Sequence, residues 1–137
     1  MKAVISKIQS SWSKREGASK DDLLQAETAL HIVFPRDYKV FLKWSNGGEG
    51  EIGNLFLSLW STNEVVTLGK DYQIAKYIPG IVAIGTDGGG KAYCLDYRTD
   101  VDNPKMVRLP LGDIDPESVH VLADDFQRWL EKSLDAT

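Results

Sequence analysis

Apolar residues recur at helical spacing at both ends of the chain and in two stretches between them. Residues 1 to about 14 predict a first helix, ended by Gly17, whose apolar face comprises Val4, Ile5, Ile8 and Trp12. Ser19 starts a second helix as its N-cap, and Asp22 at the third helical position gives a weaker form of the capping box. This second helix carries Leu23, Leu24, Glu27 and Leu30.

The Phe34-Pro35 pair breaks the second helix, and proline is tolerated in the first turn of a third, short helix. This third helix places Tyr38, Phe41 and Leu42 on one face and Trp44 near its end. Asn46-Gly47-Gly48 then supplies the left-handed residues that terminate a helix.

Short apolar runs predict strands at residues 55–60, 81–84, 92–97 and 105–109, with a helix capped by Ser61 running to about Tyr77. The loop of residues 85–90 is too short for a crossover helix, so the strands on either side of it should pair antiparallel. A last helix from about Leu122 to Leu134 has an apolar face of Leu122, Phe126, Trp129 and Leu130. The pattern predicts an α+β fold, in which a mostly antiparallel sheet packs against N-terminal and C-terminal helices.

Length and composition predict one globular domain over residues 1–137. The chain is 42% hydrophobic and 26% charged, and it has no repeat and no linker-like stretch. Cys94 is the single cysteine, which excludes an intramolecular disulfide. Lys2 and Lys7 interrupt the N-terminus before an apolar signal region develops, and no stretch approaches the roughly 20 apolar residues that span a bilayer. We therefore expect a cytoplasmic protein that is not embedded in a membrane.

The net charge of −4 is unevenly distributed, because residues 81–137 hold eleven acidic and six basic side chains. An acidic half of the chain repels phosphate backbones and argues against nucleic-acid binding. It would attract a basic protein partner and speed the encounter with it. The alternative, which charge alone leaves open, is that these acids only keep the protein soluble.

Two glycine-rich segments formally match nucleotide-binding motifs. Gly85–Lys91 has the spacing G-x-x-x-x-G-K of a phosphate-binding loop, but Ala92 replaces the Ser or Thr that holds Mg²⁺, and Asp87 would repel a nucleotide. We interpret this loop as a hairpin turn. Gly48–Gly53 spells G-x-G-x-x-G, yet it follows a helix where the fingerprint needs a strand. We interpret it as an acidic turn that leads into the first strand.

Catalytic and metal-binding patterns also break at particular residues. The acids around Asp100 lack the Gly and the closing Glu of a calcium loop and predict a solvated hairpin loop. His31 and His120 lie far apart, and neither has a second ligand at helical spacing. Cys94 lies in an alternating strand, where a single cysteine behaves as a small buried hydrophobe. The sequence therefore predicts no catalytic residue, no metal site and no cofactor.

The order of these segments resembles the SUKH superfamily, which includes bacterial immunity proteins and the fungal Smi/Knr-type cell-wall assembly regulators. The resemblance extends from about residue 20 to residue 132, and residues 1–18 are predicted as a helix outside it. Phe34 departs from the pattern, since the family more often has Leu before the proline. The residues that carry the resemblance with fold-defining roles are Pro35, Tyr38, Asn46, Gly47, Gly48, Gly85, Asp87, Gly88, Gly89 and Asp96.

These motif residues predict structure and not catalysis. Proline and glycines set turns, aromatic residues fill the seam between helices and sheet, and Asp87 and Asp96 are expected to accept backbone N–H bonds that fix the glycine hairpin. The resemblance thus implies a non-catalytic protein-binding module. In bacteria it typically implies an immunity protein that binds and neutralises a toxin encoded beside it.

Three functional hypotheses follow from the sequence. The first is such an immunity protein, acting on a toxin with a basic surface such as a nuclease; the candidate contact residues, placed in predicted loops, are Glu49, Glu51, Asp100, Asp102, Asp113 and Asp115. The second is an intracellular scaffold or regulatory interaction protein of the same fold. The third and weakest is a nucleotide-binding enzyme that uses the Gly85–Lys91 loop.

Overall fold

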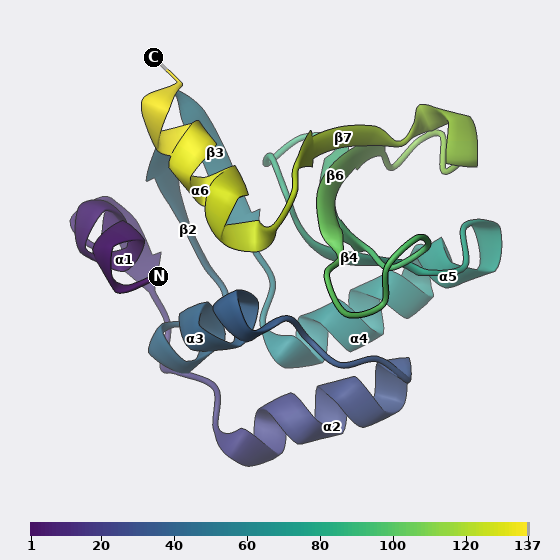
Figure 1. Ribbon diagram of the computed structural model, residues 1–137, viewed down its shortest axis with the longest axis horizontal. Coiled ribbons are helices and arrows are strands. Elements are labelled where there is room, and N and C mark those ends of the chain that lie inside the picture. The colour runs from purple at the N-terminus through teal and green to yellow at the C-terminus, as the bar shows by residue number, and fades with distance from the viewer. Residues whose placement is uncertain (137) are drawn as a thin grey trace.

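Residues 1–136, which the computed structural model describes, contain seven strands that form one antiparallel sheet in chain order (Figure 1). The strands are β1 (Trp12–Lys14), β2 (Gly48–Ile52), β3 (Leu55–Leu59), β4 (Ile81–Thr86), β5 (Lys91–Asp96), β6 (Lys105–Pro110) and β7 (His120–Ala123). The helices are α1 (Lys2–Ile8), α2 (Lys20–Leu30), α3 (Arg36–Trp44), α4 (Thr62–Asp71), α5 (Ile74–Tyr77) and α6 (Phe126–Asp135), with a 3₁₀ turn at Pro116–Ser118. The predicted α+β fold is confirmed.

The second helix begins as its sequence predicts. Ser19 Oγ accepts a hydrogen bond from the backbone N–H of Asp22 at 3.0 Å, and the Asp22 carboxylate accepts one from the N–H of Ser19 at 2.9 Å. This reciprocal pair satisfies two of the N–H groups that a helix start leaves unbonded. Pro35 stands one position earlier than predicted, since it is the N-cap of α3 and not a residue of its first turn.

Aromatic side chains join α3 and α6, each of which buries three apolar side chains in the core. The ring of Phe126 on α6 lies 5.1 Å from the ring of Tyr38 and 5.5 Å from that of Phe41, both on α3. One turn further along α6, Trp129 lies 4.8 Å from Tyr93 of β5. The predicted apolar faces of these helices therefore meet each other and the sheet, and α6 crosses in front of β2 and β3 in Figure 1.

Two predicted helices are too long, because one end of each is a short strand in the structure. The first helix stops at Ile8, and Trp12 begins β1, where its indole N–H donates to the Gly47 carbonyl at 3.3 Å. Leu122 belongs to β7, and α6 starts only at Phe126, after the N-cap Asp125. In both places helical spacing of apolar residues continued by chance into a segment that pairs with the sheet.

The prediction for the Gly48–Gly53 segment is also wrong, because most of it is strand β2, held between β1 and β3. The helix capped by Ser61 is interrupted, since Gln73 adopts a left-handed conformation with φ 57° between α4 and α5.

Of the two aspartates that were expected to fix the glycine hairpin, only Asp87 does so. Asp87 Oδ1 accepts the N–H of Gly89 at 2.8 Å and that of Lys91 at 3.3 Å, which fixes the turn between β4 and β5. Asp96 lies at the other end of β5 and instead accepts the N–H of Arg98 at 3.0 Å. The expectation that Asp96 also fixes the glycine hairpin is therefore wrong.

None of the helices formed by residues 1–136 combines the length and the apolar character that crossing a membrane requires.

Candidate protein-binding surface

One face of the sheet is open to solvent over its first three strands. Ser13 of β1 pairs with Glu49 of β2, Glu49 pairs with Ser58 of β3, and Ser58 pairs with Thr86 of β4. Residues directly opposite each other in antiparallel strands point to the same face, so these four form one row, and the pair Glu51–Phe56 forms the next. We call this surface the open face; its residues are Ser13, Glu49, Glu51, Phe56, Ser58 and Thr86.

The open face combines a large apolar side chain with two carboxylates. Phe56 is 42% exposed, and Glu49 and Glu51 are exposed on the neighbouring strand. Ile52 and Leu57, which point to the opposite face, are fully buried in the core. An exposed aromatic ring beside charged side chains is a typical anchor of protein interfaces.

The position of the Phe56 ring depends on the glycine hairpin. A Cβ placed on Gly88 would lie 2.8 Å from Cδ1 of Phe56, so the ring lies directly against the backbone of the turn. Gly88 also has φ +82°, a conformation that favours glycine. This residue therefore shapes both the turn and the edge of the open face.

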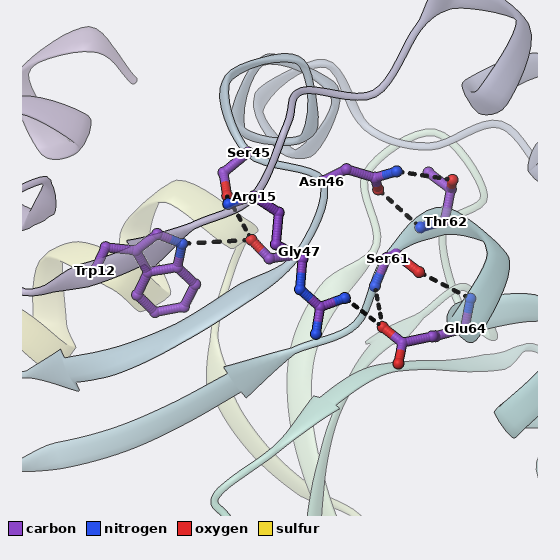
Figure 2. A network of polar contacts seen from close by, with 8 residues as sticks. All are labelled: Trp12, Arg15, Ser45, Asn46, Gly47, Ser61, Thr62 and Glu64. Atoms are coloured by element: carbon purple, nitrogen blue, oxygen red, sulfur yellow. Dashed lines mark hydrogen bonds and ion pairs between the residues drawn. The ribbon is translucent and has the colours of Figure 1, made fainter.

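The Asn46-Gly47-Gly48 motif holds the end of the sheet beside the open face (Figure 2). The carbonyl of Gly47 accepts hydrogen bonds from the Trp12 indole and, at 2.6 Å, from the hydroxyl of Ser45. The Asn46 side-chain oxygen accepts the backbone N–H of Thr62 at 2.8 Å, in the first turn of α4. These contacts connect β1, the end of α3 and the start of α4.

A second branch of the same network ends in an ion pair (Figure 2). Arg15 Nη1 donates to Glu64 Oε1 at 2.7 Å, and the same oxygen accepts the N–H of Ser61 at 2.9 Å. Partial burial of Glu64 acts to raise the pKa of its carboxyl, but the bonds from Ser61 and Arg15 outweigh it and hold this pKa below its usual value. Glu64 thus stays charged, and its ion pair joins Arg15, the residue directly after β1, to α4.

All six acids proposed from the sequence as partner contacts are exposed, but they lie in three separate places. Glu49 and Glu51 are on strand β2 and not in a loop. Asp113 and Asp115 lie in the loop after β6, which contacts the glycine hairpin through a hydrogen bond from the Leu111 N–H to the Gly90 carbonyl at 2.7 Å. There Asp113 accepts the Ser118 hydroxyl and Asp115 accepts the N–H of Glu117, each at 2.8 Å.

Asp100 and Asp102 lie at the opposite end of β5 and β6. Asp100 accepts backbone N–H bonds from Asp102 at 3.0 Å and from Asn103 at 3.1 Å, and these bonds hold the pKa of the Asp100 carboxyl below its usual value. Asp102 borders a groove of about 530 Å³ whose charged lining is otherwise basic, with Arg36, Lys39 and Lys43. The structure therefore does not join these two acids to the open face, and their role in partner binding stays a prediction.

The side chains considered for catalysis have structural positions. Cys94 is fully buried, and burial raises the pKa of its thiol. Gly85–Lys91 forms the end of β4, the turn and the start of β5, so no helix N-terminus follows it. Within residues 1–136, no three His, Cys, Asp or Glu side chains gather in a way that could hold a metal ion.

The outward-facing ring of Phe56 was not predicted, because the apolar run of residues 55–60 predicts a strand without distinguishing its two faces. The signal was present in the alternation of this segment. Leu57 and Leu59 are buried, whereas Phe56 and Ser58, which alternate with them along the strand, face outward. A strand with only one buried face predicts this arrangement.

Comparison with known families gives one result that covers most of the chain. The model described as SMI1 / KNR4 family (SUKH-1) matches residues 17–132. This range begins after β1 and includes Asn46-Gly47-Gly48, the glycine hairpin and most of α6. No curated protein sequence matches the chain significantly.

Proposed function

The chain belongs to the SMI1/KNR4 family (SUKH-1), and from this we propose that it is a protein-binding module that uses the open face. More specifically, we propose that it is an immunity protein that binds a cognate bacterial toxin and blocks it. The observation that carries the proposal is the exposed Phe56 ring beside Glu49 and Glu51 on the uncovered side of β2 and β3.

The chemistry of the open face suits a basic partner. A buried aromatic anchor contributes most of the affinity of many interfaces, and surrounding charges fix orientation and speed the encounter. Two carboxylates without a hydrogen-bond donor within 1–136 are available to arginine or lysine side chains of a partner. Toxins that act on nucleic acids carry basic surfaces, so they provide the complementary charge.

A binding measurement with the toxin encoded by the neighbouring gene tests this proposal. We expect Phe56→Ala to weaken the complex by about 2 kcal/mol, or roughly 30-fold in Kd. Reversing both charges, with Glu49→Lys and Glu51→Lys, should lower the association rate. It should also remove the loss of affinity that added salt causes in the unmodified protein. When each variant is co-expressed with the toxin, it should rescue growth less well than the unmodified protein does.

The matched control reverses two exposed acids that are neither on the open face nor among the candidate contacts, with Asp71→Lys and Glu131→Lys. This double variant has the same net charge as the double variant on the open face and should bind the toxin as the unmodified protein does. Equal loss of binding in both would show that net charge matters and the open face does not. Absence of any complex with the unmodified protein would refute the immunity function.

A scaffold or regulatory role of the same fold is the second candidate, since the open face would serve any basic protein partner equally well. Gene neighbourhood separates the two. An immunity protein requires an adjacent gene for a large secreted protein with a variable C-terminal domain, and a scaffold does not.

A further inference from the structure

A second surface of the molecule has the opposite charge character. A groove of about 710 Å³ that is open to solvent lies between the C-terminal end of α2, the helices α4 and α5, and the start of β4. In Figure 1 the helices α2, α4 and α5 lie below the sheet. The apolar part of its lining includes Leu30, Ile32, Val65, Ile74, Ile81 and Val82.

Gly69 keeps part of this groove empty. It lies one helical turn after Val65 and Val66 on α4 and lines the groove with them, and no atom lies within 4 Å of the position that its Cβ would occupy. Glycine inside a helix costs about 1 kcal/mol relative to alanine. The chain therefore retains a residue that is unfavourable for α4 at a place where a larger side chain would fill the groove.

The rim of the groove is cationic. Lys70 and Lys76 line it together with His31, and the lining contains no acidic side chain. Neither lysine forms an ion pair within the described part of the chain. Two uncompensated cations above an apolar floor are complementary to apolar side chains flanked by carboxylates.

We propose that this groove docks an apolar segment of a partner protein that has acidic residues on either side of it. A protein segment fits better than a small molecule, because small-molecule sites enclose most of their ligand and this groove is open to solvent. The segment's apolar side chains occupy the space beside Gly69, and its carboxylates pair with Lys70 and Lys76. This site is separate from the open face and does not depend on the toxin.

Fluorescence anisotropy with a defined probe tests the proposal. The probe is a short fluorescein-labelled peptide with central leucine and phenylalanine residues flanked by glutamates, and the control peptide has lysines in place of the glutamates. We expect micromolar binding of the glutamate peptide and at least about tenfold weaker binding of the lysine peptide. Equal binding of the two peptides, or no binding of either, would overturn the proposal.

Two pairs of variants locate the binding. Gly69→Trp fills the groove and should weaken glutamate-peptide binding at least about tenfold, whereas Gly69→Ala should raise thermal stability and leave binding unchanged. Lys70→Glu with Lys76→Glu should weaken binding similarly, whereas Lys2→Glu with Lys7→Glu on α1 makes the same change in net charge and should not. Circular dichroism confirms that each variant is folded.

Unchanged binding in Gly69→Trp or in the Lys70 and Lys76 variant would overturn the proposal. A fluorescent fatty acid, dansyl-undecanoic acid, tests the alternative occupant. If it binds in a manner that Gly69→Trp abolishes while the peptide does not bind, the groove is a site for a small apolar anion and the protein-docking proposal is wrong. Toxin binding by Phe56→Ala is measured separately, so failure of one proposal leaves the other standing.

Discussion

At the scale of single residues, the hydroxyl of Tyr38 destabilises the core in which it is buried. Tyr38 is fully buried, and its hydroxyl is the one buried side-chain polar atom within residues 1–136 that has no hydrogen-bond partner. Burial raises the pKa of this phenol, so it stays neutral at every physiological pH. An unsatisfied buried hydroxyl costs roughly 1–3 kcal/mol.

We therefore predict that Tyr38→Phe does not destabilise the protein and raises its free energy of unfolding by up to about 1 kcal/mol, measured by urea denaturation. Tyr97→Phe is the matched control, because the Tyr97 hydroxyl donates to the Val33 carbonyl at 2.8 Å. Its loss should cost about 1 kcal/mol. A cost of that size in Tyr38→Phe would show that the Tyr38 hydroxyl has a partner in solution.

The two aspartates of the hairpin motif show what a sequence can predict at this scale. Asp87 lies two residues before the backbone N–H that it accepts, and this short-range pattern is set by local geometry. Asp96 was assigned to the same turn, although β5 carries it to the far end of the hairpin. The ring of Phe56 is placed by Gly88, thirty-two residues further along the chain, and no local rule predicts that contact.

At the scale of elements, the start of α4 depends on a residue outside the helix. Asn46 accepts the N–H of Thr62 at 2.8 Å, in addition to the capping box formed by Ser61 and Glu64. We predict that Asn46→Ala lowers the free energy of unfolding by about 1–2 kcal/mol, because it leaves the backbone N–H of the buried residue Thr62 without this acceptor.

Asn46→Asp separates this bond from the rest of the Asn46 environment. Its carboxylate keeps the acceptor for Thr62, and its charge is favourable at a helix N-terminus, so most of the stability should remain. Thermal denaturation of both variants gives the comparison. Equal losses in the two would mean that the bond to Thr62 contributes little.

The Asp96–Arg98 pair makes the end of β5 sensitive to acid. The Asp96 side chain is only 10% exposed, and Arg98 donates to both of its carboxylate oxygens at 3.0 Å. Burial acts to raise the pKa of Asp96, but these bonds outweigh it and hold the pKa below its ordinary value of 3.8. A lowered folded-state pKa gives stability that is present above the unfolded-state pKa and is lost as pH falls through the folded-state pKa.

We predict that Asp96→Asn lowers the free energy of unfolding near neutral pH and that its difference from the unmodified protein shrinks below about pH 4. Urea denaturation at several pH values measures both proteins. Glu131→Gln, at an exposed position of α6, serves as the control and should stay within about 0.5 kcal/mol of the unmodified protein. A constant difference between Asp96→Asn and the unmodified protein across the pH range would contradict the prediction.

The elements that sequence analysis predicted are those whose pattern repeats over more than one turn or pair. The apolar faces of α3 and α6 and the hairpin of β4 and β5 belong to this group. The strands β1 and β7 were missed because they have only three and four residues, and β2 was missed because it lacks β-type composition. Strand β2 reads Gly-Glu-Gly-Glu-Ile, and its glycines are needed because a Cβ on Gly50 would lie 2.2 Å from the Ser11 carbonyl oxygen.

At the scale of the whole molecule, the N-terminal segment completes both the core and the sheet. Residues 1–16 lie outside the range matched by the family model, yet Val4, Ile8 and Trp12 are buried in the common core. Strand β1 also covers the edge of β2, and it is itself only three residues long and ends in a lysine. Short, charged edge strands discourage pairing between molecules.

We predict that deleting residues 1–16 both destabilises the protein and exposes β2 as a new edge. Three buried apolar side chains are lost, each contributing roughly 1.5–3 kcal/mol, and this sum is comparable to the whole stability of a small domain. The carbonyl of Gly47 also loses the Trp12 indole, and β2 loses its ladder with β1. Size-exclusion chromatography and thermal denaturation should show self-association and a large drop in Tm.

Deleting only residues 1–10 separates the two effects. This shorter deletion removes Val4 and Ile8 but keeps β1 and Trp12, so it should lower Tm while the protein stays in the same oligomeric state as the full chain. If the longer deletion associates no more than the shorter one, β1 does not protect the edge. The strand β1 also contributes to the open face, since Ser13 belongs to it and the Arg15–Glu64 ion pair follows directly after β1. Loss of β1 should therefore weaken partner binding at Glu49 even where the remaining fold persists.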